Sequence, residues 1–124
     1  MNSQFTMLVR IVLGITLVVF GSNMVYPFIP LPAPTGSGGD FMNSMHATGY
    51  IFPVVGILEV LIGVMLLLKK WVAFALVLLA PISINILFLH LFLGIPGLGA
   101  AIVIVVFNAI LIYKHWKQYI PLFA

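Results

Sequence analysis

Residues 51–71 read IFPVVGILEVLIGVMLLLKKW, and this stretch decides the fold. It is an apolar run with one charge, Glu59, and it ends at Lys69 and Lys70. Hydrocarbon offers the backbone no water to bond, so a spanning segment is a helix of about 20 apolar residues or a strand of a closed barrel. Barrel strands alternate polar and apolar side chains and this run does not, so it predicts a transmembrane helix.

The composition of the whole chain agrees with this reading. Of the 124 residues, 64% are hydrophobic and 6% are charged, whereas an ordinary soluble domain has roughly 25% charged residues. So few polar groups cannot cover a water-soluble globule, which excludes a soluble protein. The chain has no cysteine, which excludes a disulfide framework, thiolate metal sites and a dithiol redox cycle.

Three further apolar runs accompany the first. We expect spans at about residues 5–26, 46–68, 71–93 and 97–117. Each is long enough, at about 1.5 Å per residue, to cross a hydrocarbon core of about 30 Å. The expected fold class is therefore all-α integral membrane, a four-transmembrane-helix bundle forming one domain over residues 1–124.

Lys residues stand between the second and third spans and at the end of the fourth, which places them all on one side. They are Lys69, Lys70, Lys114 and Lys117. The opposite side carries Asp40 and no cation. The positive-inside rule then places both termini in the cytoplasm (N-in/C-in) and the loop at 27–45 outside. Residues 20–23 lack a small-x-small cleavage pattern, so we expect the first run to remain as a span.

The outer loop is rich in proline and glycine. Its prolines are Pro27, Pro30, Pro32 and Pro34, and glycines follow at 36, 38 and 39. Asp40 predicts an N-cap for a short interfacial helix over residues 41–45, with a plain linker as the alternative.

Polar side chains inside the spans are the candidate site residues, because hydrocarbon makes them costly and turns them toward partners. Glu59 lies about 15 Å from the inner boundary, near the midplane, at about 1.5 Å per residue. Arg10 starts about 8 Å in and can reach inward. Asn108 falls near the depth of Glu59, and Asn85 lies somewhat further out. We therefore predict a midplane binding cluster of Arg10, Glu59, Asn85 and Asn108.

Glycines share a helix face with both charges. These are Gly14 and Gly21 on the stripe of Arg10, and Gly49, Gly56 and Gly63 on the stripe of Glu59. Small residues allow helices to approach closely, so both charges should point at a helix interface. Glycines not used within the bundle could pack against another copy, so a homo-oligomer stays open.

Two interpretations of the cluster remain open. In the first, Arg10 and Glu59 form a structural ion pair that fixes the register of two spans, with the asparagines as hydrogen-bonding partners. In the second, the cluster binds a polar head such as a quinone carbonyl, or Glu59 relays a proton. Catalytic residues are unknown.

An outer polar set lies near the external boundary and comprises Asn23, His46 and His90. Two histidines from different helices could ligate haem or a metal, but we favour ordinary interfacial histidines and expect neither group. The chain has no phosphate-binding glycine loop, no hydrolytic triad spacing and no extended basic patch. Nucleotide, hydrolytic and nucleic-acid functions therefore find no support.

Three stretches resemble the DoxX family of small four-helix bacterial membrane proteins. They are LVRIVLG at 8–14, GYIFPVVGILE at 49–59, and APISIN at 80–85 with His90 beyond it. The resemblance covers nearly the whole chain. It implies a compact bundle in the bacterial cytoplasmic membrane, with Arg10, Glu59 and Asn85 as characteristic positions and His90 as a further candidate.

Some members of that family are associated with thiosulfate-to-quinone electron transfer, with terminal oxidases or with membrane oxidoreductase complexes, and most have no assigned reaction. The resemblance implies an accessory or quinone-interacting subunit of a redox or respiratory system, at most the membrane subunit of an oxidoreductase. Its partners would be the lipid bilayer and other oxidoreductase subunits. The alternatives are a small-solute or proton-coupled carrier that uses Glu59, and a purely structural assembly partner.

Overall fold

The computed structural model describes residues 2–124, and this part of the chain contains helices and no strand. The elements are α1 (Ser3–Val25), α2 (Gly36–Ala47), α3 (Ile51–Leu68), α4 (Val72–Leu93), α5 (Leu98–Lys114), α6 (Trp116–Tyr119) and the 3-10 helix η1 (Ile120–Phe123). The all-helical expectation is confirmed.

Three of the helices, α1, α3 and α4, are long and apolar enough to cross a membrane. A fourth candidate combines α5 with α6 and η1, from which α5 is bent by 76°. Alone, α5 has 17 residues, which is at the short end of the roughly 17–25 residues that a span needs. The chain therefore has three candidate spans, or four if the bent pair is one span, and these helices indicate a membrane protein.

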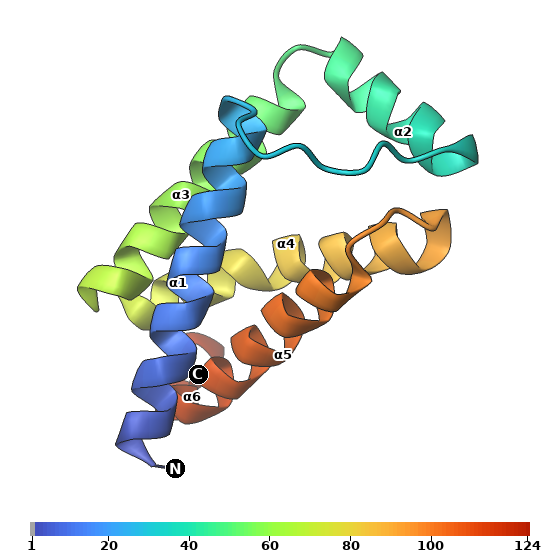
Figure 1. Cartoon of the computed structure of the whole chain (residues 1–124). Coiled ribbons are helices and arrows are strands. Elements are labelled where there is room, and N and C mark those ends of the chain that lie inside the picture. The colour runs from blue at the N-terminus through green and yellow to red at the C-terminus, as the bar shows by residue number, and fades with distance from the viewer. Residues whose placement is uncertain (1) are drawn as a thin grey trace.

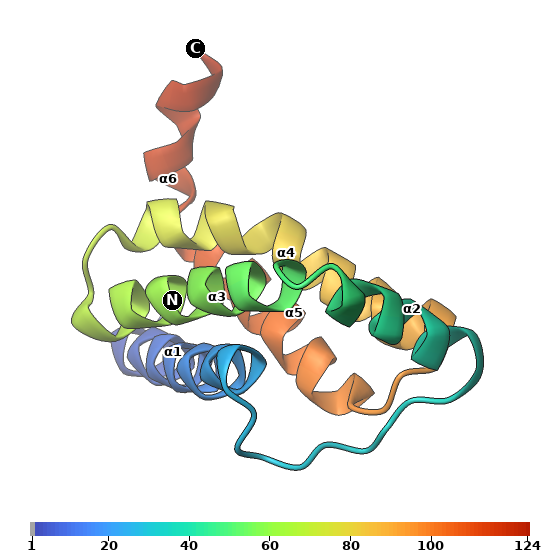
Figure 2. The ribbon, with the colours of Figure 1, turned by 90° about the horizontal axis from the view of Figure 1, so that it is seen from above.

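The helices are arranged as two pairs. Helices α1 and α3 lie side by side, and α4 packs on α5 (Figure 1). Seen from above, α2 lies over the far end of α4, and α6 points away from α5 (Figure 2). The beginning of α1, the α3–α4 turn and the end of α5 meet at one end of the molecule, where their side chains line a common cavity.

A close backbone contact joins α1 to α3 through four glycines. A Cβ on Gly21 would lie 2.7 Å from the carbonyl oxygen of Gly56, and a Cβ on Gly63 would lie 2.7 Å from that of Gly14. Any side chain would collide at these distances, so only glycine permits the contact. The predicted stripe is confirmed at these positions. Gly49 does not belong to it, because it lies in the turn before α3 with a φ of 77°.

One hydrophobic core joins the two pairs. Its fully buried members come from α1, α3, α4 and α5, and they include Leu13, Leu17, Ile62, Leu66, Leu76, Leu79 and Leu111. On α4 the buried positions recur at helical spacing, which turns one stripe of that helix toward the other three. The interior between the pairs is therefore packed with leucine and isoleucine side chains.

The outer segment differs from its predicted boundaries. Helix α2 begins at Gly36, after Thr35 in an extended conformation, so Asp40 lies inside the helix and does not cap it. The physical reason is tertiary packing, since a Cβ on Gly38 would lie 2.6 Å from the carbonyl oxygen of Leu93 at the end of α4. The second predicted span begins too early at residue 46, because the turn at Gly49 separates α2 from α3.

We expect Gly63→Ala to destabilise the bundle by about 1–3 kcal/mol, because the new methyl group must push α1 away from α3. The free energy of unfolding of the purified chain in detergent, followed by circular dichroism during denaturant titration, measures this. The matched control is Gly99→Ala on α5, where a Cβ meets no atom within 4 Å. Because alanine favours helix over glycine by about 1 kcal/mol, the control should be neutral or stabilising. Equal losses in the two variants would contradict the glycine contact.

Candidate functional site

The four residues of the predicted midplane cluster do not meet. They are distributed over four places: Arg10 lies at the end of α3, Glu59 in the α1–α3 interface, Asn108 between α4 and α5, and Asn85 on the exposed face of α4. The prediction of one polar cluster with a member from each span is therefore wrong, and each residue needs its own account.

Arg10 bonds to the end of α3. Its guanidinium donates a hydrogen bond to the carbonyl oxygen of Leu66. The glycine contacts set this pairing, because the alignment of Gly14 with Gly63 and of Gly21 with Gly56 makes Arg10 level with residue 67. Glu59 lies eight residues before residue 67, or about 12 Å at about 1.5 Å per residue. The predicted Arg10–Glu59 ion pair is therefore wrong.

Glu59 is buried where α1 crosses α3. It is 3% exposed, and a Cβ on Gly21 would lie 2.9 Å from the Cβ of Glu59, so the stem of the side chain packs directly on α1. Its predicted position at a helix interface is confirmed. An acid in such a place is a functional hypothesis in its own right, because hydrocarbon makes it costly to retain.

Asn108 links α5 to α4. Its side-chain nitrogen donates to the carbonyl oxygen of Leu76 at 3.1 Å, and its side-chain oxygen accepts from the hydroxyl of Ser83 at 3.2 Å. Both Asn108 and Ser83 are buried. All polar atoms of the amide group thus have partners within the chain, and the pair acts as an interhelical fastener.

Asn85 is on the wrong face for the predicted cluster. It is exposed, and its side-chain nitrogen donates to the carbonyl oxygen of Pro81 in its own helix at 2.8 Å. Ser83 occupies the inward position that the prediction gave to Asn85. At 100° per residue the two side chains are about 200° apart. The signal for Ser83 was present in the sequence, since it continues the stripe of Ala75, Leu76 and Leu79.

The outer polar set also separates into local contacts. The side-chain oxygen of Asn23 accepts the backbone N–H groups of Phe28 and Ile29, each at 2.8 Å, and so holds the chain as it leaves α1. The ring of His46 stacks edge-on against Phe52, with centroids 4.2 Å apart. Nδ1 of His90 lies 2.8 Å from the carbonyl oxygen of Ile95.

These contacts explain the outer residues as supports of loops and turns. Within residues 2–124 no group of three or more His, Cys, Asp or Glu side chains is placed to hold a metal ion. Each of Asn23, His46 and His90 contacts its own loop or turn, and no hydrogen bond or ring contact among the described residues joins two of them.

Polar side chains gather instead at the end where the basic residues lie. Nζ of Lys114 donates to the hydroxyl of Thr6 at 3.0 Å, and the hydroxyl of Tyr119 donates to the carbonyl oxygen of Ala73 at 2.7 Å. The sequence analysis missed these contacts, although Thr6 lies one turn before Arg10 on the same helix face.

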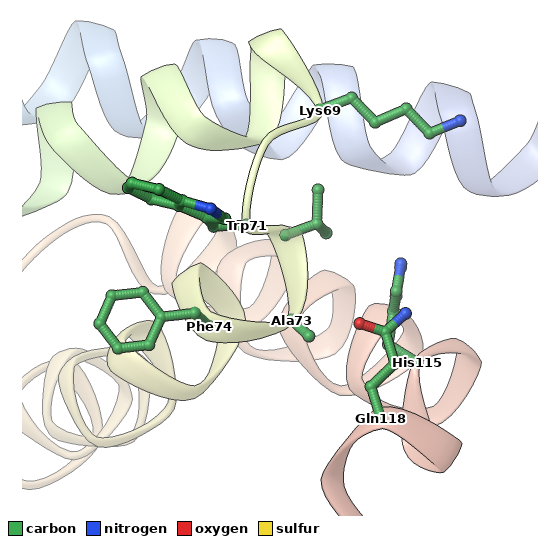
Figure 3. A pocket seen from close by; sticks show the side chains of 7 residues that line it. Lys69, Trp71, Ala73, Phe74, His115 and Gln118 are labelled. Carbon is green, nitrogen blue, oxygen red and sulfur yellow. The ribbon is translucent and has the colours of Figure 1, made fainter.

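Two cavities open at this end of the bundle. Their volumes are about 520 and 260 Å³, and Lys69, Val72 and His115 line both of them. In the larger cavity the rings of Trp71 and Phe74 lie on one side, while His115 and Gln118 lie on the other (Figure 3). Both of these cavities lie at the basic end, away from the depth predicted for the site.

Comparison of the chain with protein-family models, with curated proteins and with solved structures finds no match. The likeness to the DoxX family therefore rests on the three quoted stretches alone. Function has to be argued from the contacts of the side chains themselves, since a helical bundle by itself does not define an activity.

We expect Arg10→Gln and Glu59→Gln to have additive effects on the free energy of unfolding, within about 0.5 kcal/mol, because side chains so far apart share no partner. A double-mutant cycle in detergent measures the coupling. A coupling energy above about 1 kcal/mol would contradict this expectation and support the Arg10–Glu59 ion pair.

The positive control for this cycle is the pair Asn108→Ala and Ser83→Ala, whose side chains are in contact. Coupling between hydrogen-bonded side chains in membrane helices averages about 0.6 kcal/mol and reaches about 1.7 kcal/mol. The Asn108–Ser83 pair should therefore show measurable coupling in the same detergent, and its absence would contradict the fastener.

Proposed function

We propose that this chain is an accessory subunit of a redox system in the bacterial cytoplasmic membrane, a DoxX-like bundle that binds and positions a partner oxidoreductase subunit. The observation that carries the proposal is that, apart from Glu59, the interior polar side chains are already hydrogen-bonded within the chain. No fully buried side-chain nitrogen or oxygen of residues 2–124 lacks a hydrogen-bonding partner. A protein that binds substrate inside its bundle needs free polar groups there, whereas an assembly subunit does not.

The packing of the core supports the same reading. Leu13, Leu17, Ile62 and Leu79 are at most 1% exposed, and they fill the region where a quinone ring would have to enter between the helix pairs. The DoxX resemblance adds the redox context, since it implies association with oxidases and quinone-linked complexes. The accessory role combines that context with a closed interior.

The proposed topology has four spans with both termini in the cytoplasm, and α5 together with the bent α6–η1 segment supplies the fourth. The positions of the basic residues support this topology. The chain's five Lys and Arg residues belong to the first half of α1, the α3–α4 turn, the end of α5 and α6, and Arg10, Lys69 and Lys114 line one cavity there. A cytoplasmic position for that end satisfies the positive-inside rule.

We expect a green fluorescent protein fused after Ala124 to fluoresce and an alkaline phosphatase at the same position to be inactive, because the former folds in the cytoplasm and the latter outside it. A phosphatase inserted at Ser37 should be active. With only three spans the C-terminus would lie on the opposite side from the N-terminus, and the two C-terminal reporters would give the reverse result.

Glu59 favours a second candidate function. It is a nearly unexposed acid in the α1–α3 interface, and the cation predicted to neutralise it bonds elsewhere. A quinone-interacting subunit or a proton-coupled carrier would use such a group to take up and release a proton. The two candidates differ in whether the protein needs this proton, which the isosteric Glu59→Gln variant removes.

The decisive experiment deletes the gene from its source organism and measures quinone-linked oxygen consumption by isolated membranes. We expect the deletion to lower the rate, and the wild-type chain and Glu59→Gln to restore it equally, because the amide preserves the shape of the packed side chain. Gly63→Ala, which should loosen the bundle, should restore less than either. The partner subunit should comigrate with the wild-type chain in native electrophoresis.

Two outcomes would overturn the accessory role. A deletion that leaves every dehydrogenase and oxidase rate unchanged would remove the redox context. Failure of Glu59→Gln alone, at wild-type abundance and stability, would show that the carboxyl proton is required and would favour the quinone-interacting or carrier alternative.

A further inference from the structure

The smaller cavity at the basic end brings together cations from three separate elements. Arg10 of α1, Lys69 of the α3–α4 turn and Lys114 of α5 line it, and His115 completes that wall. Its volume of about 260 Å³ is below the roughly 300–1,000 Å³ typical of pockets for drug-sized ligands. The cavity therefore suits a compact, negatively charged group.

The chain supplies no acid to balance these charges. It has two acidic residues, Asp40 and Glu59, and neither lines the cavity. Asp40 belongs to α2, which packs on the opposite end of α4 near Leu93. Glu59 is level with Val18, two turns away from Arg10 along α1. Converging cations repel one another, so an anion from outside the chain would stabilise this end.

The donors that remain free match a phosphate group. A guanidinium has five N–H donors, and Arg10 donates one of them to the carbonyl oxygen of Leu66. An ammonium has three N–H donors, and Lys114 donates one of them to the hydroxyl oxygen of Thr6. The side chain of Ser3 also lines the cavity. Arginine and lysine donors around one oxygen-rich anion form the short, charge-assisted hydrogen bonds by which phosphate is bound.

Beside the polar side chains of Gln4 and Thr6, part of the cavity wall is apolar. Met7, Val72 and Leu111 line it, and Met7 is 49% exposed at the surface of the bundle. Inorganic phosphate has no apolar group that could contact such a wall. A phospholipid needs it, because its acyl chains must leave the headgroup along an apolar helix surface. Basic pockets between transmembrane helices on the cytoplasmic side recognise lipid headgroups in this way.

We infer that this cavity binds the phosphate headgroup of an anionic phospholipid, with Arg10, Lys69 and Lys114 as donors to the phosphate oxygens and Met7 directing the acyl chains outward. The inference does not rest on the accessory redox role. It rests on the positions of these side chains and on a bundle that lies in a membrane.

The test measures lipid binding by native mass spectrometry of the full chain in detergent. Phosphatidylglycerol and phosphatidylcholine of identical acyl chains are added in turn. Phosphatidylglycerol should bind at least about tenfold more tightly. Lys69→Gln should weaken its binding about fivefold, as expected for the loss of one cation near a headgroup. Inorganic phosphate is titrated separately, to distinguish a lipid from a soluble anion.

The matched control is Lys70→Gln, which removes the same charge from the neighbouring residue of the same turn. Lys70 lines neither cavity, so its loss should change lipid affinity less than about twofold, within the difference expected for a screened surface charge. Lys69 is exposed, so we expect its substitution to leave the fold intact. Arg10→Gln, which also removes a helix contact, serves as a second variant.

Equal losses for Lys69→Gln and Lys70→Gln would overturn the inference, because they would show a diffuse basic surface. Equal affinity for the two lipids would also overturn it. Binding of inorganic phosphate as tight as that of phosphatidylglycerol, with the same dependence on Lys69, would keep a phosphate site and overturn its assignment to a lipid.

Discussion

The backbone contact between α1 and α3 at four glycines is the constraint on which the rest of the structure depends. A membrane gives helices no hydrophobic drive to associate, so close packing has to supply the attraction. Gly14 against Gly63 and Gly21 against Gly56 bring the two backbones together and fix their register at the same time. That register then decides which polar groups can meet. It makes Arg10 level with the last turn of α3 and leaves Glu59 opposite Val18, within an apolar part of α1.

The second pair of helices is joined differently, because α5 meets α4 through side chains. Asn108 bonds both to Ser83 and to the backbone of Leu76, and the shared leucine core then attaches this pair to α1 and α3. Polar fasteners of this kind are modest in strength, but each is directional. They select one rotation of α5 about its axis, which apolar packing alone would leave degenerate. The glycine contact thus specifies the α1–α3 pair, and the hydrogen bonds of the Asn108 amide specify the α4–α5 pair.

Much of this fold could be predicted from the sequence, because hydrophobic length and glycine spacing are properties of single helices. The four apolar runs each contain one long helix, and the stripes of Gly14/Gly21 and Gly56/Gly63 do form a contact. What could not be predicted was how two stripes align, since that depends on both helices at once. The expected Arg10–Glu59 pair required a different alignment of α1 with α3 from the one that the glycines set, and for this reason the two side chains do not meet. The prediction for Asn85 failed for a different reason. It considered only the depth of the residue along the helix, whereas the helical stripe through Leu76 and Leu79 indicates that Ser83 faces inward. The beginning of α2 depended on packing against Leu93, which no local capping signal contains.

The register also has an electrostatic consequence that connects the fold to the membrane. Had Arg10 paired with Glu59, one of the three cations around the smaller cavity would have been neutralised within the chain. Because the guanidinium instead bonds a carbonyl oxygen at the end of α3, its charge stays at the cavity together with those of Lys69 and Lys114. A carbonyl oxygen satisfies a donor without cancelling its charge. The bundle therefore keeps a positive end beside an apolar wall, with no acid of the chain lining the cavity, and in the proposed lipid site a phospholipid headgroup supplies the counter-charge. The register fixed by the glycines thus leaves the charge of Arg10 at the basic end of the bundle.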